Sequence, residues 1–94
     1  MSNILHTGLG TESLIVSSSS VGFASIPGQA RRAYVRVATA DVNFENDGGA
    51  ATTSDTLLEA DEKLNLLDGL YQLSDYRFIR NGSTDATLTI SYYT

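Results

Sequence analysis

The chain has 94 residues, a net charge of −5, 18% charged residues and no cysteine. This length fits one domain, and without cysteine neither a disulfide bridge nor a thiolate metal site is possible. The acidic balance argues against binding to nucleic acid or to an anionic membrane surface, because both require a basic face. The sequence shows no secretory signal and no apolar run of about 18 residues. We therefore expect a soluble protein made in the cytoplasm, or one carried out of the cell inside a larger particle.

The N-terminal quarter contains short patterned segments separated by glycine and serine. Residues 1–11, interrupted by Gly8 and Gly10, are expected to form an N-terminal arm or a loosely held first strand. Residues 12–94 are expected to form the single domain. Strands are predicted at residues 12–17 and 21–26, and Pro27-Gly28 indicates the turn that follows.

The middle of the chain contains the strongest predicted strand, residues 32–40, in which β-branched residues alternate with larger or polar ones. Asn46-Asp47-Gly48-Gly49 indicates a turn, because these residue types tolerate positive φ angles. A polar loop is expected at residues 50–55. Further strands are predicted at residues 42–45, 56–59 and 63–67, the last two around a turn at 60–62.

Residues 66–73 fit two descriptions. Their leucines recur at nearly helical spacing, whereas Gly69 disfavours a helix by about 1 kcal/mol relative to alanine. A single turn leading into the next strand is the favoured interpretation.

The last third predicts two antiparallel strands, residues 76–80 and 86–93, joined as a hairpin around a polar turn. Alternation places Ala86, Leu88, Ile90 and Tyr92 on one face of the second strand. Tyr92 and Tyr93 should then point to opposite faces. Together these elements predict an all-β fold, a single-domain antiparallel β-sandwich that is jelly-roll-like and has about seven or eight short strands.

No set of residues in the sequence indicates catalysis. His6 is the only histidine and has no evident partner, and the common nucleophile, phosphate-binding and metalloprotease motifs are missing. We predict no enzyme, no catalytic residue and no cofactor. Asp41 to Gly48 places oxygen-bearing residues at alternate positions, as in a calcium loop. The pattern lacks the required first Asp and twelfth Glu, so a solvated strand end and turn is favoured and no metal site is predicted.

Charge is unevenly distributed along the chain. Eight of the acidic residues lie between Asp41 and Asp68, and all five arginines lie outside that block. Ordinary surface ion pairs are the favoured explanation; the alternative is a subunit whose acidic region and basic edge face complementary neighbours. An exposed terminal tyrosine would be a good interface anchor. The candidate interface residues are Arg31, Arg32, Arg36, Arg77, Arg80 and Tyr93.

Several short segments over residues 17–94 resemble a family of small structural proteins from tailed bacteriophages and prophages. The segments are Ala30-Arg31-Arg32-Ala33-Tyr34-Val35-Arg36-Val37, Val42-x-Phe44 with Asp47-Gly48, Leu57-Leu58, Leu64-x-Leu66, Phe78-Ile79-Arg80, and Thr84-Asp85-Ala86-Thr87-Leu88-x-Ile90-x-Tyr92-Tyr93. The run after Gly48 departs from the family pattern, because relatives tend to carry a proline there. The resemblance supplies no catalytic or ligand residues.

The resemblance implies a non-enzymatic β-sandwich virion protein, most simply a capsid decoration or cement protein that binds the assembled shell and stabilises it. Its partner would be the major capsid protein, its location the capsid surface, and its assembly a homo-oligomer, with a trimer favoured. A neck, tail or baseplate component is the first alternative, and a host-glycan-binding module is the second. We also expect the arm at residues 1–11 to order on a neighbouring subunit.

Overall fold

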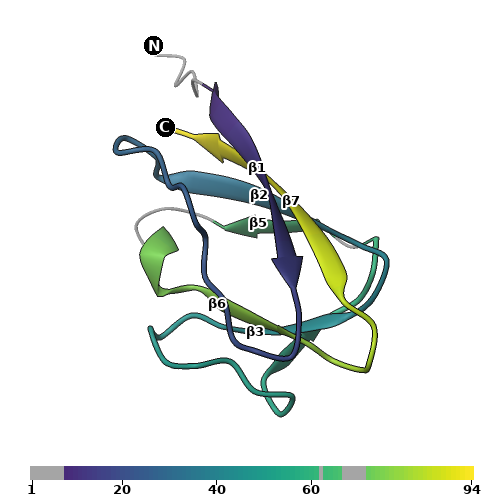
Figure 1. Ribbon diagram of the computed structural model, residues 1–94. Coiled ribbons are helices and arrows are strands. Elements are labelled where there is room, and N and C mark those ends of the chain that lie inside the picture. Colours follow the sequence, from purple (N-terminus) through teal and green to yellow (C-terminus); the bar gives the residue numbers. More distant parts are fainter. Residues whose placement is uncertain (1–7, 62, 67–71) are drawn as a thin grey trace.

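The computed structural model describes residues 8–61, 63–66 and 72–94. These residues form seven β-strands in two antiparallel sheets (Figure 1). Sheet A contains, in spatial order, β1 (Gly8–Val16), β7 (Ala86–Tyr93), β2 (Arg32–Ala38) and β5 (Lys63–Leu66). Sheet B contains β4 (Thr56–Leu58), β3 (Val42–Glu45) and β6 (Arg77–Arg80). The predicted all-β, single-domain antiparallel β-sandwich is confirmed.

The two sheets have corresponding strand orders, because the strands at corresponding positions of the two sheets are consecutive in the chain. β2 of sheet A continues into β3 of sheet B, and β6 of sheet B continues into β7 of sheet A (Figure 1). Likewise, β4 of sheet B is followed in the chain by β5 of sheet A. β1, at the edge of sheet A, is followed by a segment that lies beside the edge of sheet B, where Val21 forms a bridge to Phe78 of β6. The sandwich therefore resembles one four-stranded antiparallel sheet folded in half, which gives it its jelly-roll-like character.

The bend between β2 and β3 occurs at residues 39–41. Thr39 has a φ of 81°, outside the strand region, so the strand predicted at residues 32–40 ends at Ala38. The N–H of Ala40 donates to the carbonyl of Ala38 over 3.0 Å. The carboxylate of Asp41 accepts from the N–H of Ala60 over 2.8 Å, which ties this bend to the end of β4. These local bonds redirect the chain into sheet B.

The core lies between the sheets, and alternation along the strands supplies it. The inward residues of β2 and β7 are buried, and Tyr92 and Tyr93 point to opposite faces as predicted. Sheet B contributes Val42, Leu58 and Phe78. The buried residues of the two sheets form one apolar cluster: Val16, Ala33, Val35, Val37, Val42, Leu58, Leu73, Tyr76, Phe78, Ala86, Leu88, Ile90 and Tyr92.

The prediction of a closing hairpin was wrong, although both of its strands exist. β6 pairs with β3 in sheet B, whereas β7 lies between β1 and β2 in sheet A. β7 pairs with these two neighbours along nearly its whole length, so no edge of β7 remains for β6. Residues 81–85 therefore connect the two sheets instead of forming a tight turn.

The strand predicted at residues 21–26 is also absent. Only Val21 makes a bridge, to Phe78, and the chain beyond it is irregular. Phe23 belongs to this irregular segment and its ring contacts Tyr76, Phe78 and Tyr92, with centroids 6.1, 5.5 and 5.8 Å away. The residues that resembled a strand instead supply an aromatic side chain to the core, and packing of that ring outweighs local strand propensity.

The remaining boundaries shift by a few residues. The first strand begins at Gly8 instead of residue 12, so residues 8–11 belong to β1, and residues 1–7 with His6 lie outside the described residues. A 3-10 turn at Leu73–Asp75 precedes β6, whereas residues 67–71, most of the segment for which a single turn was predicted, lie outside the described part. In the described residues, no helix has the length and apolar character needed to span a membrane.

Candidate functional site

The outward face of sheet A carries mainly polar side chains across three paired strands, β1, β7 and β2. Strand alternation directs its side chains away from the core, and the register places them in rows across β1, β7 and β2. Across these three strands, the outward residues are Thr11, Ser13, Ile15, Thr87, Thr89, Ser91, Tyr93, Arg32, Tyr34, Arg36 and Ala38. None of these is acidic, although the chain as a whole has a net charge of −5.

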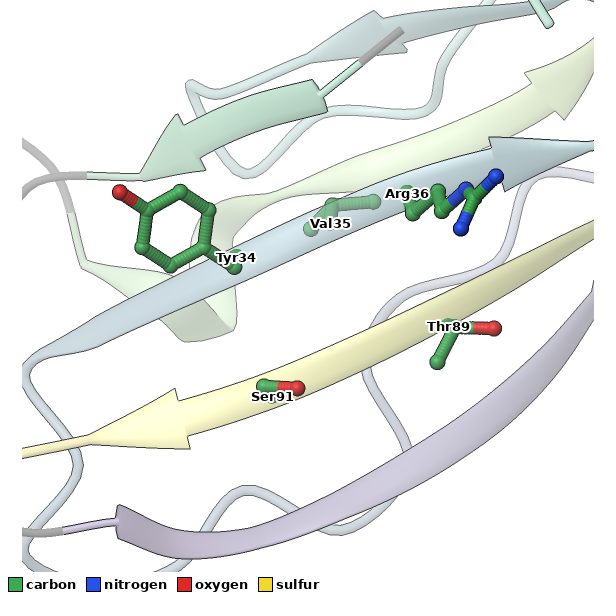
Figure 2. A pocket seen from close by; sticks show the side chains of 5 residues that line it. All are labelled: Tyr34, Val35, Arg36, Thr89 and Ser91. Carbon is green, nitrogen blue, oxygen red and sulfur yellow. The ribbon is translucent and has the colours of Figure 1, made fainter. Parts of the chain in front are cut away.

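A shallow hollow of about 440 Å³ lies in the middle of this face, over β2 and β7 (Figure 2). Its lining consists of Tyr34, Val35, Arg36, Thr89 and Ser91. The register explains why these residues meet: Tyr34 lies opposite Ser91, and Arg36 lies opposite Thr89. An aromatic ring and a guanidinium group therefore stand on β2, while two short hydroxyl side chains lie beside them on β7.

Neighbouring side chains hold the walls of the hollow. The ring of Tyr34 meets the ring of Tyr93 edge to face, with centroids 6.1 Å apart, yet Tyr34 is still 48% exposed. Nη2 of Arg36 lies 4.0 Å from Oδ1 of Asp61, and both side chains are mostly exposed. An ion pair of this length at the surface contributes little, so the guanidinium group keeps most of its capacity to bind a partner.

The chemistry of the hollow suits binding. Arg36 donates in a planar fork that matches a carboxylate or a carbonyl pair, Thr89 and Ser91 donate or accept, and Tyr34 offers an aromatic edge. In the described residues, no group of three His, Cys, Asp or Glu side chains is placed to hold a metal ion. These groups are typical of a contact surface for a protein or a carbohydrate.

Three of the six predicted interface residues lie on the outward face of sheet A, and a fourth lies at the end of β7. Arg32 lies opposite Tyr93 in the register, and Arg36 follows on the same face of β2. The N–H of Arg31 donates to the carbonyl of Tyr93 over 2.8 Å, which brings Arg31 to the end of β7. Arg32, Arg36 and Tyr93 therefore share the outward face of sheet A, and Arg31 lies beside the end of β7.

The other two predicted residues lie in sheet B and make contacts within the chain. Nη1 of Arg77 donates to the carbonyls of Ser74 and Tyr76 over 2.6 and 2.9 Å. Nη1 of Arg80 lies 2.6 Å from Oδ1 of Asp85. Arg77 thus fastens the 3-10 turn to β6, and Arg80 fastens the crossing into β7. The structure does not bring them to the hollow.

Sequence reasoning missed Tyr34, Thr89 and Ser91 as members of a site. Alternation alone placed each on the outward side of its strand, and that signal was available. The sequence offered no means to know that β2 and β7 are neighbours, since 47 residues separate the end of one from the start of the other. The register, and with it the hollow, required the structure.

The calcium-like stretch uses its oxygen atoms locally. Asn43 is buried, donates to the carbonyl of Asp55 over 2.9 Å and accepts from the side chain of Asn81 over 2.8 Å. The carboxylate of Asp47 accepts from the N–H of Gly49 over 2.8 Å. Asn43 therefore connects three segments around sheet B.

A second polar arrangement lies on the inner side of sheet A, around Glu12. Its carboxylate accepts from the hydroxyl of buried Tyr92 and from the N–H groups of Ala24 and Ser25, over 3.2 and 3.1 Å for the latter two. The irregular segment that carries Phe23 is thereby tied to β1. Burial raises the pKa of Tyr92 well above its ordinary value, and the hydrogen bond and the negative charge of Glu12 raise it further.

This arrangement predicts a loss of stability in alkaline solution. An unfolded tyrosine ionises near pH 10, whereas folded Tyr92 stays protonated at that pH. The contribution of Tyr92 is therefore complete below about pH 10 and is lost as the pH rises further, by up to about 1.4 kcal/mol per pH unit. Urea unfolding between pH 8 and 11 measures it.

The matched variants are Tyr92→Phe and Tyr93→Phe. We expect a shallower alkaline decline for Tyr92→Phe, because phenylalanine has no proton to lose. Tyr93→Phe should keep the steep decline of the parent. Equal slopes for the parent and Tyr92→Phe would show that another group causes the alkaline loss.

Comparisons of the chain with protein-family models, with curated proteins and with solved structures find no match.

Proposed function

We propose that the chain is a non-enzymatic structural protein of a tailed-phage virion, a capsid decoration or cement protein that attaches to the assembled shell through the outward face of sheet A. The family resemblance supplies the class of particle, and the outward face supplies the means of attachment. The partner is the major capsid protein, whose exposed surface would offer carboxylate or carbonyl groups to the hollow.

The observation that carries this proposal is the charge of the face. The outward residues of β1, β7 and β2 include arginines and tyrosines but no carboxylate, so this face of an acidic chain is complementary to an acidic partner surface. Tyrosine and arginine are also the residue types enriched at protein interfaces. Many identical copies would engage the shell together, so modest contacts suffice, and a trimer, as the resemblance implies, would increase this effect.

The attachment is tested with shells of the encoding phage that lack this protein. We expect Arg36→Gln to weaken binding to such shells about tenfold or more, because a bidentate charge-assisted contact is lost. Thr53→Glu, in an exposed loop near sheet B, changes the net charge by the same amount and should leave binding unchanged. Equal binding of Arg36→Gln and the parent protein would rule out the outward face of sheet A as the attachment surface.

Two measurements separate this proposal from its alternatives. Many copies per purified particle, spread over the shell, fit a decoration protein, whereas a few copies at one vertex fit a neck, tail or baseplate component. The exposed ring of Tyr34 beside two hydroxyl side chains also fits a sugar. Binding of the isolated protein to host surface glycans, abolished by Tyr34→Ala, would favour the glycan-binding module.

A further inference from the structure

The edges of the two sheets are protected unequally. The segment after β1 covers the edge of β6. Val21 and Phe78 exchange two backbone hydrogen bonds of 2.9 and 2.7 Å, and the N–H of Arg80 donates to the carbonyl of Ser17 over 3.0 Å. β4 and β5 are edge strands of only three and four residues. β1 is an edge strand of nine residues. In the described part of the chain, no strand pairs with its far side.

The sequence of β1 carries few of the features that keep an edge strand from pairing. It has no proline, lysine or arginine, and Glu12, its single charged residue, faces inward and accepts three hydrogen bonds. A register irregularity between Gly8 and Gly10 disturbs only the first residues. Beyond it, Thr11, Ser13 and Ile15 face outward in regular alternation, and Ile15 is 58% exposed. Beyond Gly10 the edge of β1 is regular and its outward side chains are uncharged, which leaves it available to pair with another strand.

We propose that β1 pairs with β1 of a second copy of this chain, antiparallel and about a two-fold axis at Ser13, so that the two A sheets form one continuous eight-stranded sheet.

The pattern of side chains favours this register. Residues that lie opposite each other in antiparallel strands share a face. If the two-fold axis passes through a residue, that residue lies opposite itself in the second copy, and the two cores lie on the same side of the joint sheet. Centring the axis on Glu12 would place two carboxylates opposite each other, which is unfavourable. Centring it on Ser13 places the two serines together, Thr11 opposite Ile15 of the second copy, and Glu12 opposite Leu14 of the second copy. β-branched residues then meet on the outward face.

The contact is independent of the proposed attachment. It uses the edge of β1, whereas the hollow lies over β2 and β7. In the joint sheet both hollows face the same side, so a dimer would present two of them to a shell. The contact has two-fold symmetry, so it would not by itself build the trimer that the resemblance implies.

A single engineered cysteine tests the register, because the chain contains no other. Residues opposite each other across an antiparallel pair have Cα atoms about 4.5 to 5.5 Å apart, within disulfide range. We expect Ser13→Cys to form a covalent dimer rapidly under mild oxidation. Ile15→Cys is the control, since its two copies would lie about 13 Å apart along the strands and should not cross-link.

A charge variant tests the contact without cross-linking. Ser13→Lys places two ammonium groups together and should shift the parent dimer, measured by sedimentation over a range of concentrations, to monomer. Thr56→Lys on exposed β4 adds the same charge and should leave the dimer intact. A monomeric parent at all concentrations, a trimer, or equal cross-linking of the two cysteine variants would each overturn the proposal. Loss of shell binding with the dimer intact would instead count against the attachment face alone.

Discussion

Replacing Phe78 with alanine is expected to lower the free energy of unfolding by about 3–5 kcal/mol. The side chain of Phe78 is fully buried, and its ring contacts Phe23 and Phe44 with centroids 5.5 and 6.3 Å away. It is central to the cluster in which sheet B, the irregular segment after β1 and the end of β7 meet. The truncation would leave a cavity that three separate parts of the chain line, and small domains have only about 5–15 kcal/mol of stability in total.

Urea unfolding followed by circular dichroism measures this loss. The matched control is Leu57→Ala on β4, where a large apolar side chain is 47% exposed and its removal should cost little. A cost below about 1 kcal/mol for Phe78→Ala, or one no greater than for Leu57→Ala, would contradict the placement of Phe78 at the centre of the core.

Replacing Glu12 with alanine is expected to lower the free energy of unfolding by about 2–3 kcal/mol, although glutamate is usually a surface residue. The variant would leave the buried hydroxyl of Tyr92 without its acceptor and would release the N–H groups of Ala24 and Ser25. Hydrogen bonds to a charged acceptor are stronger than neutral ones. The segment that carries Phe23 would then lose its attachment to β1.

Two measurements separate this effect from a general weakening of β1. Urea unfolding gives the size of the loss, and Ser13→Ala, the exposed neighbour of Glu12, should cost less than about 0.5 kcal/mol. Hydrogen exchange should show faster exchange at Ala24 and Ser25 in Glu12→Ala, with the amides of β7 still protected. Unchanged exchange at these two amides would contradict the role assigned to Glu12.

Alternation along individual strands was sufficient to predict the fold class and most of the strands. Ala86, Leu88, Ile90 and Tyr92 are all buried, as the alternating pattern required, and β3 has the predicted bounds. These successes share a cause: period-two alternation is a local property, and burial on one face of a sheet maintains it.

The failures concern which strands are neighbours and where the chain crosses between sheets. β6 and β7 are consecutive and connected by a polar segment, so a hairpin was the simplest pairing, yet β1 and β2 occupy both edges of β7. Glu12 illustrates the same limit. Glu12 alternates with the outward residues Thr11 and Ser13, but its partner Tyr92 is 80 positions away and could not be identified from the sequence. The hollow, too, depends on the pairing of β2 with β7, which the sequence alone does not specify.

The functional conclusion rests on attachment of the chain to an assembled shell through the outward face of sheet A. Imaging of purified particles at side-chain resolution tests this claim most directly. We predict many copies on the capsid surface, with Tyr34 and Arg36 covered by the major capsid protein and sheet B facing solvent. Copies attached through sheet B with the hollow exposed, or particles that lack the chain, would contradict it.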